Sequence, residues 1–231
     1  MNNRFIAGSG AQVSESTFLS RVFLWMSLGL FLSTASAMTI LGNEPLLRAV
    51  ANQWIYLGIA LVQFGLVIWV NRSIMTMSVP MARSVFAVYS LMNGPLFAVI
   101  LLIYTGASVV STFAIATGTF LFFSFYGMAT KRDLTSIGQL ALMGVIGLIL
   151  ASLVNIFLKS SAMMWIITYV GIAIFVVLIA YQTQQLKALY AAGFDHPDIR
   201  KKMDVLGALT LYIALINLFL MLLNLFGRRR E

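Results

Sequence analysis

Seven long runs of apolar residues fill almost the whole of the 231-residue chain, with short polar stretches between them. A transmembrane helix needs about 20 consecutive apolar residues, and each run has about that length. The runs are continuously apolar and do not alternate with a period of two, which argues against the strands of a membrane β-barrel. We therefore predict an all-α integral membrane protein. Its seven spans are expected at residues 22–41, 54–70, 84–104, 109–129, 137–158, 164–186 and 205–226.

The composition supports lipid as the solvent of this chain. Hydrophobic residues make up 61% of it and charged residues 10%, whereas a soluble domain has about 45–50% and about 25%. The spans leave room for one membrane domain and no separate soluble one. We expect a cytoplasmic tail over residues 1–21, a seven-helix membrane domain over residues 22–227 and a basic tail over residues 228–231.

The positive charges predict the orientation of the chain. Ten Lys and Arg residues fall on the side of the N-terminus and five on the other side, so the positive-inside rule places the N-terminus in the cytoplasm. Arg228, Arg229 and Arg230 resist this assignment, because seven crossings put them outside. The alternative is that the last segment does not fully cross. Since the basic residues lie at span ends and not in a soluble run, nucleic-acid binding is not expected.

Catalytic and metal-binding motifs are not evident. The chain has no cysteine, and His196 is its only histidine, so a zinc or iron site lacks the usual set of ligands. No predicted span carries an Asp or Glu in its interior, which removes the paired acids that an intramembrane protease needs. We predict a protein that is not an enzyme and holds no cofactor.

Neutral polar side chains remain inside the spans. We expect Gln63, Asn155 and Asn217 to form hydrogen bonds between helices, as amides in membrane bundles do. In the predicted orientation, Arg72 and Gln182 lie near the cytoplasmic ends of their helices. The turn from Ala214 to Asn217 lies somewhat deeper, so these groups are expected to converge in one polar cluster.

Several stretches carry a resemblance to a known family. They are YTGASVVSTF at 104–113, YGMATKRDLTSIG at 126–138, GLILASLVNIFLKS at 147–160, AYQTQQLK at 180–187 and LGALTLYIALINLFLMLLNLFG at 206–227. The chain resembles the Bax inhibitor-1 family, the transmembrane Bax-inhibitor-motif proteins, including its bacterial YccA- and YbhL-like branches. The resemblance implies a bacterial inner-membrane protein with a central seventh helix wrapped by two three-helix halves.

The resemblance also implies a function and a site. Members of the family are described as pH-sensitive calcium leaks, and eukaryotic members as suppressors of cell death. Their gate is attributed to two aspartates, in a YDTQ motif and in an LYLDFINLF motif, with an arginine near the second helix. Here Gln182 stands at the first position, Ala214 at the second, and Arg72 is an approximate match for the arginine.

These departures bear on the expected activity. A carboxylate pair titrates and attracts Ca²⁺, whereas Gln and Ala do neither. The resemblance therefore predicts a calcium leak whose acidic gate is replaced, so that the leak is shut or insensitive to pH. One alternative is a regulatory partner of a membrane quality-control protease. Another is a small-metabolite transporter, although neither an inverted repeat nor a pair of broken helices is evident.

Overall fold

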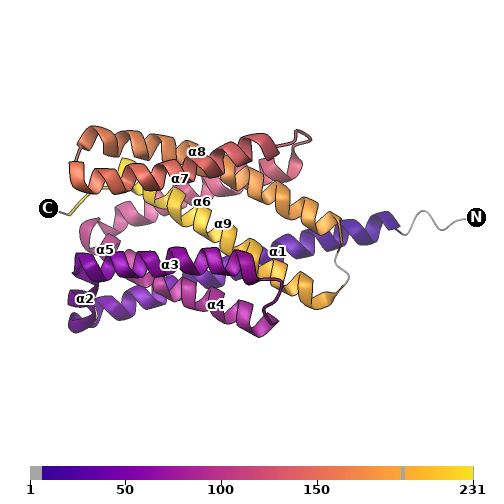
Figure 1. The fold of residues 1–231 in the computed structure, drawn as a ribbon, viewed down its shortest axis with the longest axis horizontal. Coiled ribbons are helices and arrows are strands. Elements are labelled where there is room, and N and C mark those ends of the chain that lie inside the picture. Colours follow the sequence, from indigo (N-terminus) through magenta and orange to yellow (C-terminus); the bar gives the residue numbers. More distant parts are fainter. Residues whose placement is uncertain (1–6, 194–195, 231) are drawn as a thin grey trace, which may run out of the picture. The chain divides into compact units, whose positions relative to one another are not determined.

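The computed structural model describes residues 7–193 and 196–230, and all regular structure within these ranges is helical except for one isolated bridge between Tyr104 and Arg229 (Figure 1). The helices are α1 (Ala7–Leu41), α2 (Glu44–Ala51), α3 (Gln53–Ser73), α4 (Val79–Met92), α5 (Gly94–Ile103), α6 (Gly106–Ala129), α7 (Thr135–Leu158), α8 (Ser161–Ala191) and α9 (Pro197–Phe226). Seven segments of the described chain are long and apolar enough to cross a membrane, with α4 and α5 together forming the third. The predicted all-α class and the seven spans are confirmed.

The helices group into two compact units. The first contains α1 to α5 with residues Leu189–Tyr212, and the second contains Tyr104–Ala188 with Ile213–Glu231. Helix α9 thus contributes its first half to one unit and its second half to the other. It is also the most buried of the seven segments, at 67% of its apolar window against at most 44% for the rest, as expected for the central helix of the family fold.

In the first unit the third segment is broken where a single helix over residues 84–104 is predicted. Pro95 has no N–H, so the carbonyl oxygen of Leu91 loses its helical partner. The Ser36 hydroxyl of α1 donates to this oxygen at 2.9 Å, and the Ser33 hydroxyl donates to the carbonyl of Ser90 at 2.7 Å. A helix can break in lipid only where such partners satisfy the backbone, so α1 stabilises the break between α4 and α5.

Tyr212 lies at the buried centre of the first unit. Its hydroxyl is 2.5 Å from the Ser33 hydroxyl, and its side chain is fully buried. The rings of Phe86 and Tyr89 meet it edge-on at centroid distances of 6.0 and 6.1 Å. Edge-to-face aromatic pairs of this kind add stabilisation beyond the area they bury, and here they join α4 to the first half of α9.

In the second unit glycines allow the helices to approach closely. A Cβ built on Gly127 of α6 would overlap the backbone of Ala180 on α8, and one on Gly138 of α7 would overlap the ring of Tyr181. Small residues at such crossings are the usual means of packing helices in lipid. On the other side of α8, Gly171 lies against Met221 of α9.

Several helices differ in length from the predicted spans. Helix α1 begins at Ala7 and not at Val22, and the short helix α2 was not predicted. The residues between the sixth and seventh predicted spans, 187–204, are also mostly helical, because α8 continues to Ala191 and α9 starts at Pro197. The prediction placed the helix ends where the apolar runs stop, but an α-helix continues through polar residues once its backbone bonds are formed.

Candidate functional site

Gln182 lies on a buried face of α8. It continues a stripe with Phe175, Leu178, Ile179 and Leu186, spaced by three and four residues as on one side of a helix. Its Oε1 atom is buried and has no hydrogen-bond partner among the described residues. A buried amide oxygen without a partner costs about 1–3 kcal/mol, so Gln182 is a polar group that the local packing does not satisfy.

The residues around Gln182 attach α8 to the connection between α6 and α7. Gln184 accepts the backbone N–H of Leu134 at 2.9 Å and donates to the carbonyl of Arg132 at 2.8 Å. Lys187 donates to the carbonyl of Met128 at 3.0 Å. The TKRDL and YQTQ motifs lie about 50 residues apart in the sequence, and neither motif alone predicts these contacts. The structure brings the two motifs together, which gives Gln184 and Lys187 a positioning role.

Asp133, within the same connection, accepts the backbone N–H of Thr135 at 2.8 Å. Hydrogen bonds from the Thr135 side chain and backbone lower the pKa of this carboxyl below its ordinary value of 3.8. Because its pKa is depressed in the folded state, any stability that it contributes is present above pH 3.8 and is lost as the pH falls through the lowered value. Asp133 therefore does not titrate near neutral pH.

Ala214 is 2% exposed and lies on α9 between the buried side chains of Leu211, Leu215 and Leu218. Gln182 and Ala214 are thus both located in the second unit, on buried stretches of α8 and α9. Neither can carry a charge. Arg72 lies in the last turn of α3, is exposed, and belongs to the first unit. The predicted cluster that includes Arg72 therefore stays a prediction.

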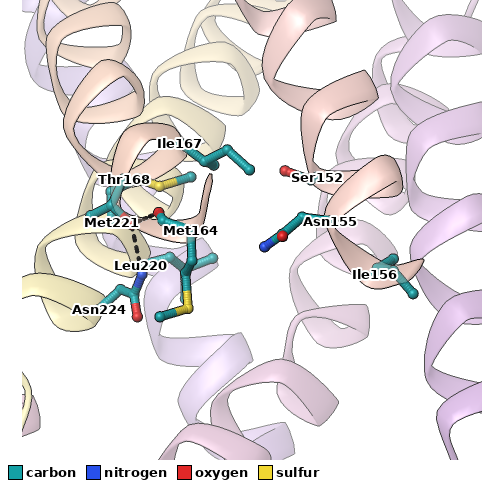
Figure 2. Close-up of a pocket in the computed structure, with 9 residues that line it drawn as sticks. All are labelled: Ser152, Asn155, Ile156, Met164, Ile167, Thr168, Leu220, Met221 and Asn224. Carbon is teal, nitrogen blue, oxygen red and sulfur yellow. Dashed lines mark hydrogen bonds between the residues drawn. The ribbon is translucent and has the colours of Figure 1, made fainter. Parts of the chain in front are cut away.

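The amides expected to link helices have mixed partners. Asn217 donates to the Ile213 carbonyl of its own helix at 2.8 Å, and Asn155 accepts the backbone N–H of Ser160 at 3.0 Å. The Nε2 atom of Gln63 is buried without a partner among the described residues. A hydrogen bond between helices comes instead from Asn224 on α9, whose Nδ2 donates to the Thr168 hydroxyl of α8 at 2.6 Å (Figure 2).

The first unit holds a buried acid that the sequence prediction placed outside the spans. Asp204 is 4% exposed, and the Arg21 guanidinium of α1 is 3.9 Å from its Oδ2. Its Oδ1 atom, and the Nε atom of Arg200, have no hydrogen-bond partner among the described residues. The seventh span was predicted to start at Val205, directly after Asp204. The helix starts seven residues before Asp204, so this carboxylate lies inside α9, where its apolar run begins.

Comparison with known proteins identifies the family. The profile described as "Inhibitor of apoptosis-promoting Bax1" matches residues 15–231 of the chain. The inner membrane protein YbhL of Escherichia coli K12 is 41% identical over 93% of the chain and 92% of its own length. The chain belongs to the Bax inhibitor-1 family. Uncharacterized proteins of Borreliella burgdorferi and Rickettsia prowazekii are 38% and 37% identical, over 94% and 93% of the chain and 94% and 90% of their own lengths.

Membership in the Bax inhibitor-1 family makes the chain a multi-pass membrane protein and is consistent with a role outside catalysis. Within residues 7–193 and 196–230, no three His, Asp or Glu side chains come together as a group that could hold a metal. Gln182 and Ala214 offer a hydrogen-bonding amide and a methyl group. Their chemistry is limited to neutral contacts.

Proposed function

We propose that the chain is an inner-membrane protein of the calcium-leak type in which the acidic gate is replaced by neutral residues. It is expected to pass little Ca²⁺ and to show no pH transition near neutrality. The location is supported by the name of its relative in Escherichia coli, an inner membrane protein. The N-terminus is expected in the cytoplasm, from the bias of positive charge.

The observation that carries the proposal is the pair of neutral residues at the two gate positions. Gln182 has a buried carbonyl oxygen without a partner, and Ala214 is buried among leucines. Two carboxylates close together would titrate as a coupled pair, with one pKa raised toward neutral pH. An amide oxygen is a hard ligand, but it brings no negative charge to offset the dehydration of a divalent cation. Gln182 and Ala214 therefore provide neither a titrating pair that could act as a pH switch nor a negative charge that could bind Ca²⁺.

Calcium flux in liposomes tests the proposal. The purified chain should show flux close to that of empty liposomes, with no transition between about pH 6 and 8, where a raised carboxylate would act. The double variant Gln182→Asp with Ala214→Asp should gain pH-dependent flux, and each single variant should gain less. The matched control is Gln182→Asn with Ala214→Asn, which has almost the same shape as the double aspartate variant and cannot titrate.

Arg72 is the proposed counter-charge of the restored acids. On the double aspartate background, Arg72→Ala should shift the pH of the transition, because an arginine near a carboxylate stabilises its charged form. The proposal is contradicted by an unmodified chain that leaks Ca²⁺ with a clear pH transition, since the gate would then lie elsewhere.

The neutral pair also favours a second candidate function. A chain that has lost both acids retains the membrane fold, and it can serve as a regulatory partner of a membrane quality-control protease. The same flux assay separates the two functions. Absence of flux in every variant, including the double aspartate one, together with copurification of a membrane protease, would support the partner and not the leak.

A further inference from the structure

A hollow lies in the second unit where α7 ends, α8 begins and α9 ends (Figure 2). Its volume is about 330 Å³, within the range of about 300–1,000 Å³ that is usual for ligand sites. Its lining residues are Ser152, Asn155, Ile156, Met164, Ile167, Thr168, Leu220, Met221 and Asn224. This hollow shares no residue with the gate positions.

The polar groups of the hollow are partly free to bind a ligand. The Asn155 Oδ1 is occupied by the backbone N–H of Ser160, and its Nδ2 faces the hollow (Figure 2). Ser152, one turn earlier on α7, also presents its hydroxyl to the hollow. On the facing wall, Asn224 uses its Nδ2 to bind Thr168. The α7 wall therefore offers hydrogen-bond donors suited to an acceptor such as an ester carbonyl.

The rest of the lining is hydrocarbon or thioether, and no charged residue lines the hollow. A bare ion would lose its hydration there without compensation. Helix α7 is also poorly covered by the protein, because only 11% of its apolar window is buried and Phe157 is 85% exposed. In a membrane this helix contacts acyl chains, so a lipid can enter the hollow from the side.

Positive charge is concentrated directly beyond the hollow. Lys159 follows Asn155 by four residues at the end of α7. Arg228 follows Asn224 by four residues, lies two residues past the end of α9, where its backbone bonds to Thr105 and Ser108, and is continued by Arg229 and Arg230. All four are exposed. The described part of the second unit has one acid, Asp133, which precedes the opposite end of α7; Glu231 lies outside the described residues. These four cations are among the five that the positive-inside rule leaves on the non-cytoplasmic side.

We propose that the hollow binds one anionic diacyl phospholipid. Its phosphate would contact Lys159 and the arginines at 228–230, and its glycerol ester would accept hydrogen bonds from Asn155 and Ser152. One acyl chain would lie along the apolar wall of the hollow. Along the end of α7, the charge of Lys159 comes first, then the amide of Asn155, then apolar side chains. A phospholipid has its phosphate, ester and acyl chain in the same order. This assignment gives the arginines at 228–230 a role on the non-cytoplasmic side, where the positive-inside rule does not call for positive charge.

Native mass spectrometry of the purified chain, titrated with phosphatidylglycerol or phosphatidylcholine of the same acyl chains, tests the proposal. Phosphatidylglycerol should bind more tightly. Lys159→Asn should weaken it about five-fold, the usual effect of one basic residue near an anionic lipid. Asparagine suits this position because Lys159 has a left-handed backbone with a φ of 49°. The matched control is Lys131→Asn, an exposed lysine before the other end of α7, which should leave the affinity unchanged.

A second variant tests the hollow itself. Ser152→Leu should fill it and reduce phosphatidylglycerol binding, whereas Gly147→Leu adds the same side chain on α7 where nothing lies within 4 Å and should have no effect. Thermal unfolding of each variant identifies any loss of fold. The proposal would be overturned if the two lipids bound equally, or if both Lys159→Asn and Ser152→Leu bound phosphatidylglycerol as well as the unmodified chain. It would also be overturned if inorganic phosphate alone stabilised the chain against thermal unfolding as much as the lipid does.

Discussion

The ion pair between Asp204 and Arg21 allows a prediction in which the two partners have opposite effects on stability. Asp204→Leu should leave the stability of the fold unchanged or increase it, and Arg21→Leu should reduce it. The reason is that the carboxylate is 5% exposed while the guanidinium is 42% exposed. The acid therefore bears most of the desolvation cost, and the arginine serves mainly to offset it.

The distance between Asp204 and Arg21 sets the size of the expected change in the free energy of unfolding. Two unit charges 3.9 Å apart attract each other by about 4 kcal/mol at an effective dielectric constant of about 20, and solvent around Arg21 lowers this value. Against it stand a desolvation penalty of several kcal/mol for the carboxylate and about 1–3 kcal/mol for its unpaired Oδ1. Replacement by an apolar side chain of similar volume should therefore change stability by about 0 to +2 kcal/mol.

Loss of the arginine should have a larger and opposite effect. Removing one partner of a buried pair costs about 3–5 kcal/mol, and we expect about 2–3 kcal/mol here because Arg83 and Arg200 also lie within electrostatic range of the carboxyl. Thermal unfolding in detergent measures the difference, and the double variant should recover most of the loss. A larger destabilisation from Asp204→Leu than from Arg21→Leu would refute this reasoning.

Three further predictions concern packing and topology. Gly127→Ala should destabilise the chain by about 1–3 kcal/mol, because the new Cβ meets the backbone of α8. Gly118→Ala on the same helix places its Cβ in open space and should stabilise the chain by up to about 1 kcal/mol through helix propensity. Equal effects of the two variants would contradict the close approach of α6 and α8. Asn217→Leu should lower the melting temperature only slightly, because Asn217 Nδ2 donates to the Ile213 carbonyl of its own helix. A loss of about 0.6–1.7 kcal/mol would instead mean that its oxygen has a partner on another helix. Cysteines placed singly at Ser14 and Ala192 should resist an impermeant thiol reagent added outside intact cells, and ready labelling of both would reverse the predicted orientation.

The number and type of the membrane-spanning segments could be read from the sequence, because hydrocarbon leaves the backbone few alternatives to the helix. The ends of the helices could not. Hydropathy marks where apolar side chains stop, whereas α1, α8 and α9 continue through polar residues as long as their backbone bonds are maintained. Pro95 indicates a break in the third segment. The hydroxyls that bind the carbonyls at this break, those of Ser33 and Ser36, are more than 50 residues away in the sequence, and only the fold brings them together.

The candidate site, too, could be predicted from the sequence only in part. The motif positions of Gln182 and Ala214 come from the sequence, and the stripe of buried residues on α8 explains why Gln182 faces inward. The burial of Asp204 was not predictable, because a charged residue at the edge of an apolar run normally indicates the water interface. Gln184 and Lys187 were missed for another reason. They bind backbone carbonyl and N–H groups of a distant connection, and such contacts leave no pattern in the residue types.

The serine contacts at the break between α4 and α5 constrain how the chain is made. Pro95 removes the N–H that would bind the Leu91 carbonyl, so in lipid without α1 this oxygen would lose the Ser36 donor at a free-energy cost. The donors, Ser33 and Ser36, belong to α1, which precedes this segment in the chain. The third segment is therefore expected to be stable in the bilayer only once α1, which lies more than 50 residues earlier in the chain, is packed beside it.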